Sequence, residues 1–323
     1  MHQTLATLLL AATVATAADD PGATRIARWK DDKACAFLLM FDDSLPSQVK
    51  NVVPELTRRG FIGTFFINPS NGLYAGNRLA WEKDIPAAGF ELGNHTLTHK
   101  GGKSAADIAQ EVRACNDVIH ATTPTLPWPR LVSWGQPGGI KPESWPISKE
   151  ELAVALKENH LVTRPDFGGR GAMIAFKTGP EMLAHVDKAI AQGSMEGIIF
   201  HGVGGEWITT PLPVFLELVE GLAARRDKLW VTGHIRAVQY AIEREAATVT
   251  LGTRDAAQIT LTLACTADPK FYDQPLTLRT TVPADWTTCA ISQGKRQTEA
   301  RASAGTVRYD AVPGNEPIVI TRR

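Results

Sequence analysis

The sequence predicts an α/β barrel of parallel strands followed by a small antiparallel β domain. Up to Glu245, short apolar runs alternate with amphipathic stretches in which apolar residues recur every three or four positions. Beyond Glu245, apolar and polar residues alternate singly and the helical period disappears. A third observation is that reactive side chains gather where the apolar runs end, which is where parallel barrels place their active sites.

The expected strands of the barrel are seven apolar runs, each bounded by Gly, Pro or polar residues. They are residues 36–41, 63–67, 90–93, 130–134, 161–165, 197–200 and 229–232. Parallel neighbours need long crossovers, which are usually helices. This many strand-helix units favours a closed or nearly closed barrel over an open doubly wound sheet.

Amphipathic stretches between the runs predict the helices. Ser104 is a candidate N-cap for a helix over 105–120, and Ser148 with Glu151 has the capping-box form. Gly60 is a stop signal for the first helix. The expected helices cover residues 49–59, 105–120, a segment after Ser148, 182–191, 213–224 and 235–245.

The remaining segments predict a small β domain of the sandwich kind. They are 248–251, 258–265, 275–282, 289–292, 305–309 and 317–321. We therefore expect a signal peptide over 1–18, the barrel over 19–246 and a sandwich-like accessory domain over 247–323. This last domain has no dense aromatic strip, so a glycan-binding role is neither indicated nor excluded.

Composition narrows the class of partner. Lys+Arg and Asp+Glu both number 34, and no basic tract occurs, so the electrostatic footprint of a nucleic-acid-binding protein is missing. No segment reaches the roughly 18 apolar residues that a membrane-spanning helix needs, so stable membrane insertion is not expected. A neutral glycan fits the charge balance, and the oligomeric state stays open.

The first residues resemble an export signal. An apolar run from Leu5 to Val14 ends in Ala15-Thr16-Ala17, the small-x-small form that precedes signal-peptidase cleavage. A secreted or periplasmic protein is therefore expected. The alternative is a hydrophobic N-terminus without export, because no Lys or Arg precedes the run.

Four cysteines occur, and an exported chain permits disulfides. Cys265 and Cys289 are one possible pair and Cys35 and Cys115 the other, with buried free thiols as the equal alternative. No Cys-x-x-Cys pair is present, which argues against a zinc-thiolate site.

One carboxylate and two imidazoles form the candidate metal site. Asp42-Asp43 closes the first apolar run, while His95 and His99 follow the third at an i, i+4 spacing that can aim both rings at one point. Three protein ligands with open positions are typical of a catalytic metal, which activates water and polarises a carbonyl. The second carboxylate then remains for a general base.

His201 ends the sixth run, and an imidazole can act as a general acid near neutral pH. Asp166, Gln136 and His234 also lie at or after run ends, which places them on the same predicted rim. No Gly-x-Ser-x-Gly elbow occurs, which argues against a serine hydrolase.

These motifs resemble those of the polysaccharide deacetylase family, the NodB-homology group of carbohydrate esterases. The resemblance rests on Phe41-Asp42-Asp43, on 95–99 (His-Thr-Leu-Thr-His) and on Phe200-His201. It implies a distorted (β/α)7 barrel and removal of N- or O-linked acetyl groups from sugars. It also implies Asp42 as base, Asp43, His95 and His99 as ligands of zinc or another divalent metal, His201 as acid, and Thr96 as a loop-steadying residue.

Two departures from the family pattern stand out. An Arg-x-Pro motif is usual after the fourth strand and its Arg orients an acidic residue, but here 133–139 reads Ser-Trp-Gly-Gln-Pro-Gly-Gly. A backbone donor near Gly138 can still hold an oxyanion. The family's later Asp-Trp element is matched only loosely by Asp166-Phe167, and Arg170 is a candidate replacement for the missing cation.

Three functions follow as hypotheses. The leading one is a secreted metal-dependent deacetylase or esterase acting on an acetylated glycan, with Trp134 and Trp207 as candidate sugar-stacking residues. The others are a hydrolase of cyclic amides or ureides, and a catalytically silent glycan-binding protein. Zn²⁺ is the expected metal, although this ligand set also accepts Co²⁺, Ni²⁺, Mn²⁺ or Fe²⁺.

Overall fold

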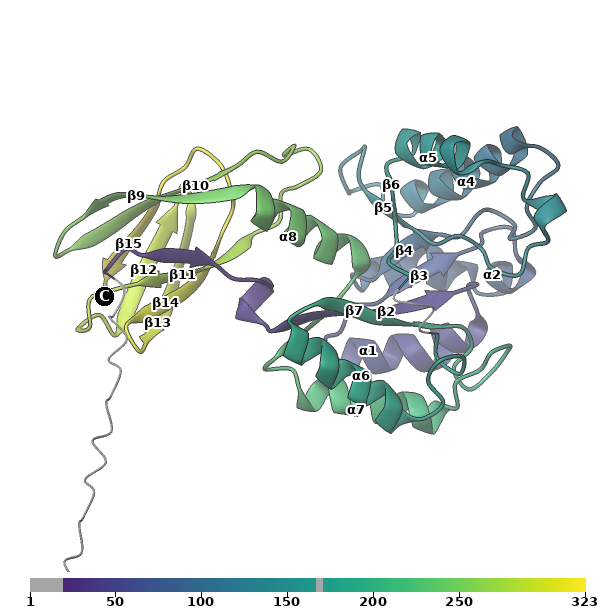
Figure 1. Cartoon of the computed structure of the whole chain (residues 1–323), viewed down its shortest axis with the longest axis horizontal. Coiled ribbons are helices and arrows are strands. Elements are labelled where there is room, and N and C mark those ends of the chain that lie inside the picture. Colours follow the sequence, from purple (N-terminus) through teal and green to yellow (C-terminus); the bar gives the residue numbers. More distant parts are fainter. Residues whose placement is uncertain (1–19, 167–170) are drawn as a thin grey trace, which may run out of the picture.

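The computed structural model describes residues 20–166 and 171–323, so the expected signal peptide and Arg170 lie outside the described residues. A parallel sheet with helices forms one part and an antiparallel β structure forms the other, with α8 (His234–Ala246) running between them (Figure 1). No helix in these ranges is long and apolar enough to cross a membrane.

The seven predicted strands of the parallel sheet are confirmed. They are β2 (Cys35–Asp42), β3 (Thr64–Ile67), β4 (Glu91–Asn94), β5 (Val132–Trp134), β6 (Leu161–Thr163), β7 (Met195–Phe200) and β8 (Leu229–Thr232). Their order is β6-β5-β4-β3-β2-β7, with β8 paired to the first half of β2. This is the distorted barrel that the sequence predicts, and its strands share one direction, so their carboxyl ends meet on one rim.

Helices cover the outside of the sheet. They include α1 (Val53–Arg59, after a π-helical turn over Gln48–Val52), α4 (Ala105–Ala121), α5 (Lys149–Glu158), α6 (Gly179–Gln192) and α7 (Leu212–Ala224). Figure 1 shows α4 beside α5 and α6 beside α7, and both pairs are in contact. The predicted caps form, because Ser104 accepts from Asp107 N and Ser148 shares a capping box with Glu151.

Three short helical segments between β3 and β4 were not expected from the sequence. They are α2 (Gly72–Gly76), a π-helical turn (Ala80–Asp84) and α3 (Ile85–Ala87). Each is too short to show an amphipathic period. Trp81 and Ile85 from this region are fully buried against the core.

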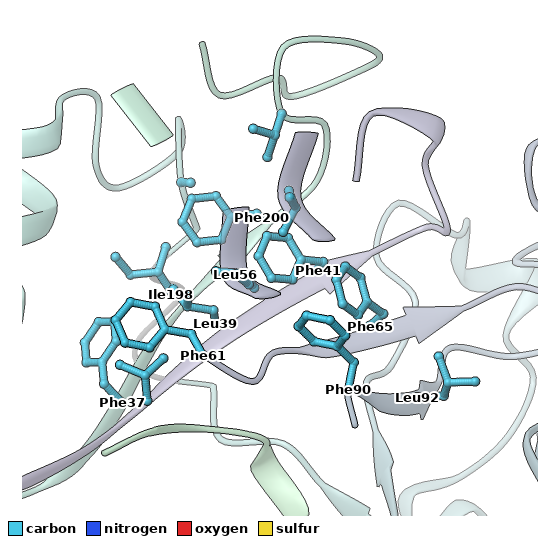
Figure 2. Packing of buried hydrophobic residues seen from close by; sticks show 14 of the residues in the cluster. Phe37, Leu39, Phe41, Leu56, Phe61, Phe65, Phe90, Leu92, Ile198 and Phe200 are labelled. Carbon is cyan, nitrogen blue, oxygen red and sulfur yellow. The ribbon is translucent and has the colours of Figure 1, made fainter. Parts of the chain in front are cut away.

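Strand β2 is buried along its whole length and organises the core. Alternate residues point to opposite faces, so Phe37, Leu39 and Phe41 pack in the layer under the helices while Met40 packs on the other face. Figure 2 shows the aromatic part of the helix-side layer, in which the Phe41 ring lies 4.9 Å from that of Phe65. This packing fixes the end of β2, where the acidic pair begins.

The antiparallel part is an eight-stranded sheet in the order β1-β11-β14-β13-β12-β15-β10-β9. These are β1 (Thr24–Ile26), β9 (Ala247–Arg254), β10 (Gln258–Cys265), β11 (Leu276–Thr281), β12 (Thr288–Gln293), β13 (Arg296–Ser303), β14 (Thr306–Ala311) and β15 (Ile318–Arg322). The sequence analysis missed β1 and β13. Because β1 pairs with β11, residues 24–26 belong to the antiparallel sheet, although the sequence analysis assigns them to the barrel range of 19–246.

Helix α8 ties the two parts together. The Tyr240 hydroxyl donates to Ala27 O at 3.0 Å and accepts from Thr277 N at 3.3 Å. At the start of α8, the half-buried Glu91 carboxylate accepts from the N–H groups of Ile235 and Arg236, which supplies the cap that Gly233 lacks.

The four cysteines are free thiols, so neither predicted disulfide forms. Cys35, Cys115 and Cys289 are buried, and Cys265 is half-buried. Burial raises the pKa of Cys35 to about 12 and also raises that of Cys115. Thiols whose pKa is raised in this way are poor nucleophiles.

Candidate active site

The acidic pair separates into two environments at the end of β2. Asp42 is two residues beyond Met40 and points to the same inner face of the strand. Asp43 has a φ of 77°, so the chain turns sharply after the strand and its carboxylate faces the neighbouring loop. Both side chains are buried, with 3% of Asp42 and 6% of Asp43 exposed.

The loop after β4 brings both predicted histidines to Asp43. Asp43 Oδ1 lies 3.5 Å from His95 Nε2 and 3.4 Å from His99 Nε2. The Asn68 amide donates to His95 O, and Thr96 Oγ1 accepts from His99 N at 3.2 Å. Thr96 thus makes the loop contact that the family resemblance implies.

This cluster fits a divalent metal by its own geometry. Asp43, His95 and His99 place one ligand atom each within 4.8 Å of one another. Bonds of about 2.0–2.2 Å in a tetrahedral zinc site require ligand-to-ligand distances of roughly 3.3–3.5 Å, which the two Asp43 distances match. His95 Nδ1 lies 2.6 Å from Gly135 O, so that nitrogen carries the proton and Nε2 is left as the ligand atom.

The charge state of the cluster also suits a cation. Burial raises the pKa of Asp43, but the adjacent His95 outweighs burial and holds the pKa below its usual value. Burial and the nearby His95 lower the pKa of His99. An ionised carboxylate and a neutral imidazole are the forms that bind metal.

Arg164 pairs with Asp42, a contact that the sequence analysis missed. Its guanidinium donates from Nη1 to Oδ1 at 2.5 Å and from Nη2 to Oδ2 at 2.8 Å. Burial alone would raise the pKa of Asp42. The positive charge of Arg164, and after it the nearby His95, has the larger opposite effect and holds this pKa far below its usual range. The cation that appeared to be missing after the fourth strand therefore comes from the end of β6.

Gly135 makes room for this guanidinium. A side chain at position 135 would place its Cβ 2.9 Å from Arg164 Cζ and 2.9 Å from Phe66 Cδ1. Arg164 also lies over the Phe66 ring, with Cζ 4.4 Å from the ring centroid. Gly135 begins the tripeptide Gly-Gln-Pro and stands where the Arg-x-Pro motif of the family has its Arg. In the sequence, this replacement of Arg by Gly was the one indication that a cation from another segment pairs with the acidic residue.

His201 follows β7 on the same rim. Its Nε2 lies 3.9 Å from Asp43 Oδ2, and 18% of its side chain is exposed. The Gln48 amide donates to both Asp42 O and His201 O, which joins the ends of β2 and β7. Trp207, in the loop after β7, donates from Nε1 to Asp43 Oδ2 at 2.7 Å.

Several sequence candidates lie apart from this cluster. Trp134 is 1% exposed and packs in the core, so its ring is not available to a sugar. Asp166 is exposed two residues beyond Arg164, and Gly138 is exposed in the turn after β5. His234 is fully buried and paired with Ser133 Oγ at 2.7 Å, so it lies inside the barrel rather than on the rim.

Comparison with known proteins supports the motif assignment. Residues 30–144 match the family model for polysaccharide deacetylase. This range contains Asp42, Asp43, His95 and His99, and it ends before Arg164 and His201.

Among curated proteins, a gellan lyase from Bacillus sp. is 22% identical over 299 residues, covering 84% of this chain. The chain spans 12% of that relative's length.

Among solved structures, the peptidoglycan deacetylase PdaC of Bacillus subtilis is 16% identical, with a TM-score of 0.43 over 63% of this chain and 90% of its own. A CE4 family pseudoenzyme from Bacillus anthracis is 17% identical, with a TM-score of 0.44 over 66% of this chain and 68% of its own. A peptidoglycan N-acetylglucosamine deacetylase domain from Eubacterium rectale is 14% identical, with a TM-score of 0.46 over 64% and 96%.

The family match confirms, over residues 30–144, the resemblance to the polysaccharide deacetylase family that the motifs predict.

Proposed function

We propose that the protein is a metal-dependent deacetylase that removes acetyl groups from a glycan. The observation that carries this proposal is the pairing of two separate devices on one rim. A three-ligand cluster is built on Asp43, and a carboxylate outside it, Asp42, is held ionised by Arg164. A protein that only binds metal has no need of the second carboxylate.

Asp43, His95 and His99 would hold the metal, and the ligand spacing favours zinc. When bound, the cation supplies Lewis acidity, which polarises the acetyl carbonyl and makes a water more acidic. The buried position of Asp43 and His95 strengthens this electrostatic effect by excluding bulk water.

Asp42 acts as the general base. Its carboxylate takes a proton from water while the water oxygen forms a bond to the acetyl carbon. Arg164 holds both Asp42 oxygens, so the carboxylate cannot rotate away from the site. The N–H of Gly138, which makes no hydrogen bond to another described residue, is a candidate donor to the developing oxyanion.

His201 acts as the general acid. As the bond from the acetyl carbon to the sugar nitrogen or oxygen breaks, the imidazolium gives its proton to the departing atom and acetate is released. Its Nε2 lies 3.9 Å from Asp43 Oδ2, whereas His95 and His99 approach Oδ1, and its buried Nδ1 has no hydrogen-bond partner among the described residues.

The substrate class is an acetylated polysaccharide or oligosaccharide, N- or O-linked. The formal charge of zero fits a neutral glycan. Export remains a prediction from residues 1–18, and the sandwich is proposed as an accessory domain beside the barrel.

Acetate release tests the proposal. Purified protein, stripped of metal with a chelator and reloaded with one equivalent of Zn²⁺, is incubated with acetylated chitin and acetylated xylan oligosaccharides. We expect acetate only from the reloaded protein. Hydrolysis of cyclic imides in preference to either glycan would favour the alternative of a cyclic amide or ureide hydrolase. Tight glycan binding without acetate release would favour the alternative of a catalytically silent glycan-binding protein.

A further inference from the structure

Trp207 stands between the candidate metal site and solvent. Its indole N–H donates to Asp43 Oδ2 at 2.7 Å, while 44% of the residue is exposed. The N–H edge of the indole is therefore hydrogen-bonded to a candidate metal ligand, and much of the remaining ring is exposed to solvent. Neither the family motifs nor the catalytic assignments above give this residue a role at the metal.

The hydrogen bond distinguishes the two oxygens of Asp43. Oδ1 is the oxygen that faces His95 and His99, and Oδ2 is the one that accepts from the indole. A carboxylate held in this way presents one oxygen to a cation rather than two. Hydrogen bonds to a ligand's second atom orient the ligand and raise metal affinity.

The loop that carries Trp207 is anchored on both sides. The Glu206 carboxylate accepts from Ser47 Oγ and from Ser47 N, and Gly202 N donates to Trp207 O at 3.2 Å. Gly202 is required for this closure, because a Cβ there would lie 1.8 Å from Gly205 O.

Backbone strain appears at the tip of the same loop. Ile208 has a φ of 45°, a region that β-branched residues rarely adopt, and this costs on the order of 1–3 kcal/mol. Its side chain is 43% exposed beside Trp207, so burial does not account for the conformation. The strained residue directly follows Trp207 in the chain.

We propose that Trp207 is a positioning residue for the metal ligand Asp43 and that its exposed ring face binds a sugar ring of the substrate. The second half rests on the proposed function, since it takes the ligand to be a glycan. Aromatic faces beside polar sites are suited to this use, because the ring is apolar while its N–H is engaged elsewhere.

Two substitutions separate the roles. Trp207→Phe keeps an aromatic face and removes the N–H donor, whereas Trp207→Gln keeps a donor and removes the ring. Trp128→Phe is the matched control, because Trp128 is 61% exposed in the loop before β5, at the opposite end of the barrel. Thermal unfolding of each metal-free variant checks that the fold is intact.

Metal affinity is read by calorimetric titration of metal-free protein with Zn²⁺, without any turnover. We expect Trp207→Phe to bind Zn²⁺ about tenfold more weakly than the wild type, and Trp128→Phe to match the wild type. Equal affinity in the wild type and Trp207→Phe would overturn the positioning role alone. No binding by the wild type would overturn both that role and the proposed function.

Glycan binding is read separately with a deacetylated product oligosaccharide on Zn²⁺-loaded protein. We expect Trp207→Gln to bind it roughly three- to tenfold more weakly, and Trp207→Phe to stay close to the wild type. Unchanged affinity in Trp207→Gln would overturn the stacking role and leave the metal result standing.

Discussion

Arg164 and Asp42 form a two-point ion pair inside the barrel, although they lie 122 positions apart in the sequence. Only 12% of the Arg164 side chain and 5% of the Asp42 side chain are exposed. Removing one member of a buried pair strands the other charge, which costs about 3–5 kcal/mol. The pair therefore contributes to the stability of the fold as well as to the catalytic role that we propose for Asp42.

Arg164→Met should lower the free energy of unfolding by about 3–5 kcal/mol, because it leaves the Asp42 carboxylate buried without a counter-charge. Adding Asp42→Asn in the same chain should recover much of that loss. Urea unfolding of the two single variants and the double variant measures the coupling. The exposed Arg225–Asp187 pair is the control, and Arg225→Met should cost less than about 1 kcal/mol. Additive effects at Arg164 and Asp42 would contradict the pairing.

Gly135→Ala should destabilise the fold by on the order of 1–3 kcal/mol, because its Cβ meets Arg164 and Phe66 at 2.9 Å. Gly138→Ala is the matched control, since a Cβ there has no atom within 4 Å. Thermal unfolding of the two variants compares them directly. Equal melting temperatures would show that the guanidinium does not occupy the space beside Gly135.

Zn²⁺ should stabilise the wild type against heat, because a ligand that binds only the folded state adds about 2.7 kcal/mol at one hundred times its Kd. His95→Ala removes one of three ligands and should abolish this Zn²⁺-dependent rise in melting temperature. His160→Asn, at a histidine outside the cluster whose φ is 54°, controls for loss of a histidine. A persistent rise in His95→Ala would place the metal elsewhere.

The carboxyl group of Glu243 should lower the free energy of unfolding as the pH rises from about 4.5 to 7. Burial raises its pKa to about 7 in the folded protein, from an ordinary value of 4.5. Below about pH 4.5 the carboxyl is protonated in both states, but between that pH and 7 the unfolded chain loses the proton first, which favours unfolding.

Glu243→Gln keeps an acceptor for Gln274 N and removes this titration. We expect the variant to be more stable than the wild type at pH 8, by on the order of 1–2 kcal/mol, and equal to it near pH 4. If the free energies of unfolding of the wild type and Glu243→Gln differed by the same amount at every pH from 4 to 8, the raised pKa of Glu243 would be refuted.

Periodicity predicted most of the barrel, because strands with one continuous apolar run and helices with a clear amphipathic face carry their signal locally. Strand β1 has only three residues, and β13 (Arg296–Ser303) has too little apolar alternation to register. Both are held by pairing with partners in the folded sheet, which no local window contains.

The site was predictable to the extent that its residues follow strand ends. Asp42, Asp43, His95, His99 and His201 meet on one rim because parallel strands share a direction. Arg164 was missed because its role depends on the space left by Gly135, directly after the neighbouring strand β5. Trp134 was misjudged because its position at a strand end did not reveal that its ring packs inward.

The most direct measurement compares wild type with Asp42→Asn for metal content and for acetate release from acetylated oligosaccharides. The variant keeps the ligands Asp43, His95 and His99, so both proteins should bind about one Zn²⁺ per chain. Loss of a positioned general base should slow acetate release by about 10²–10⁴-fold. Full release by Asp42→Asn, or by wild type that holds no metal, would contradict the account.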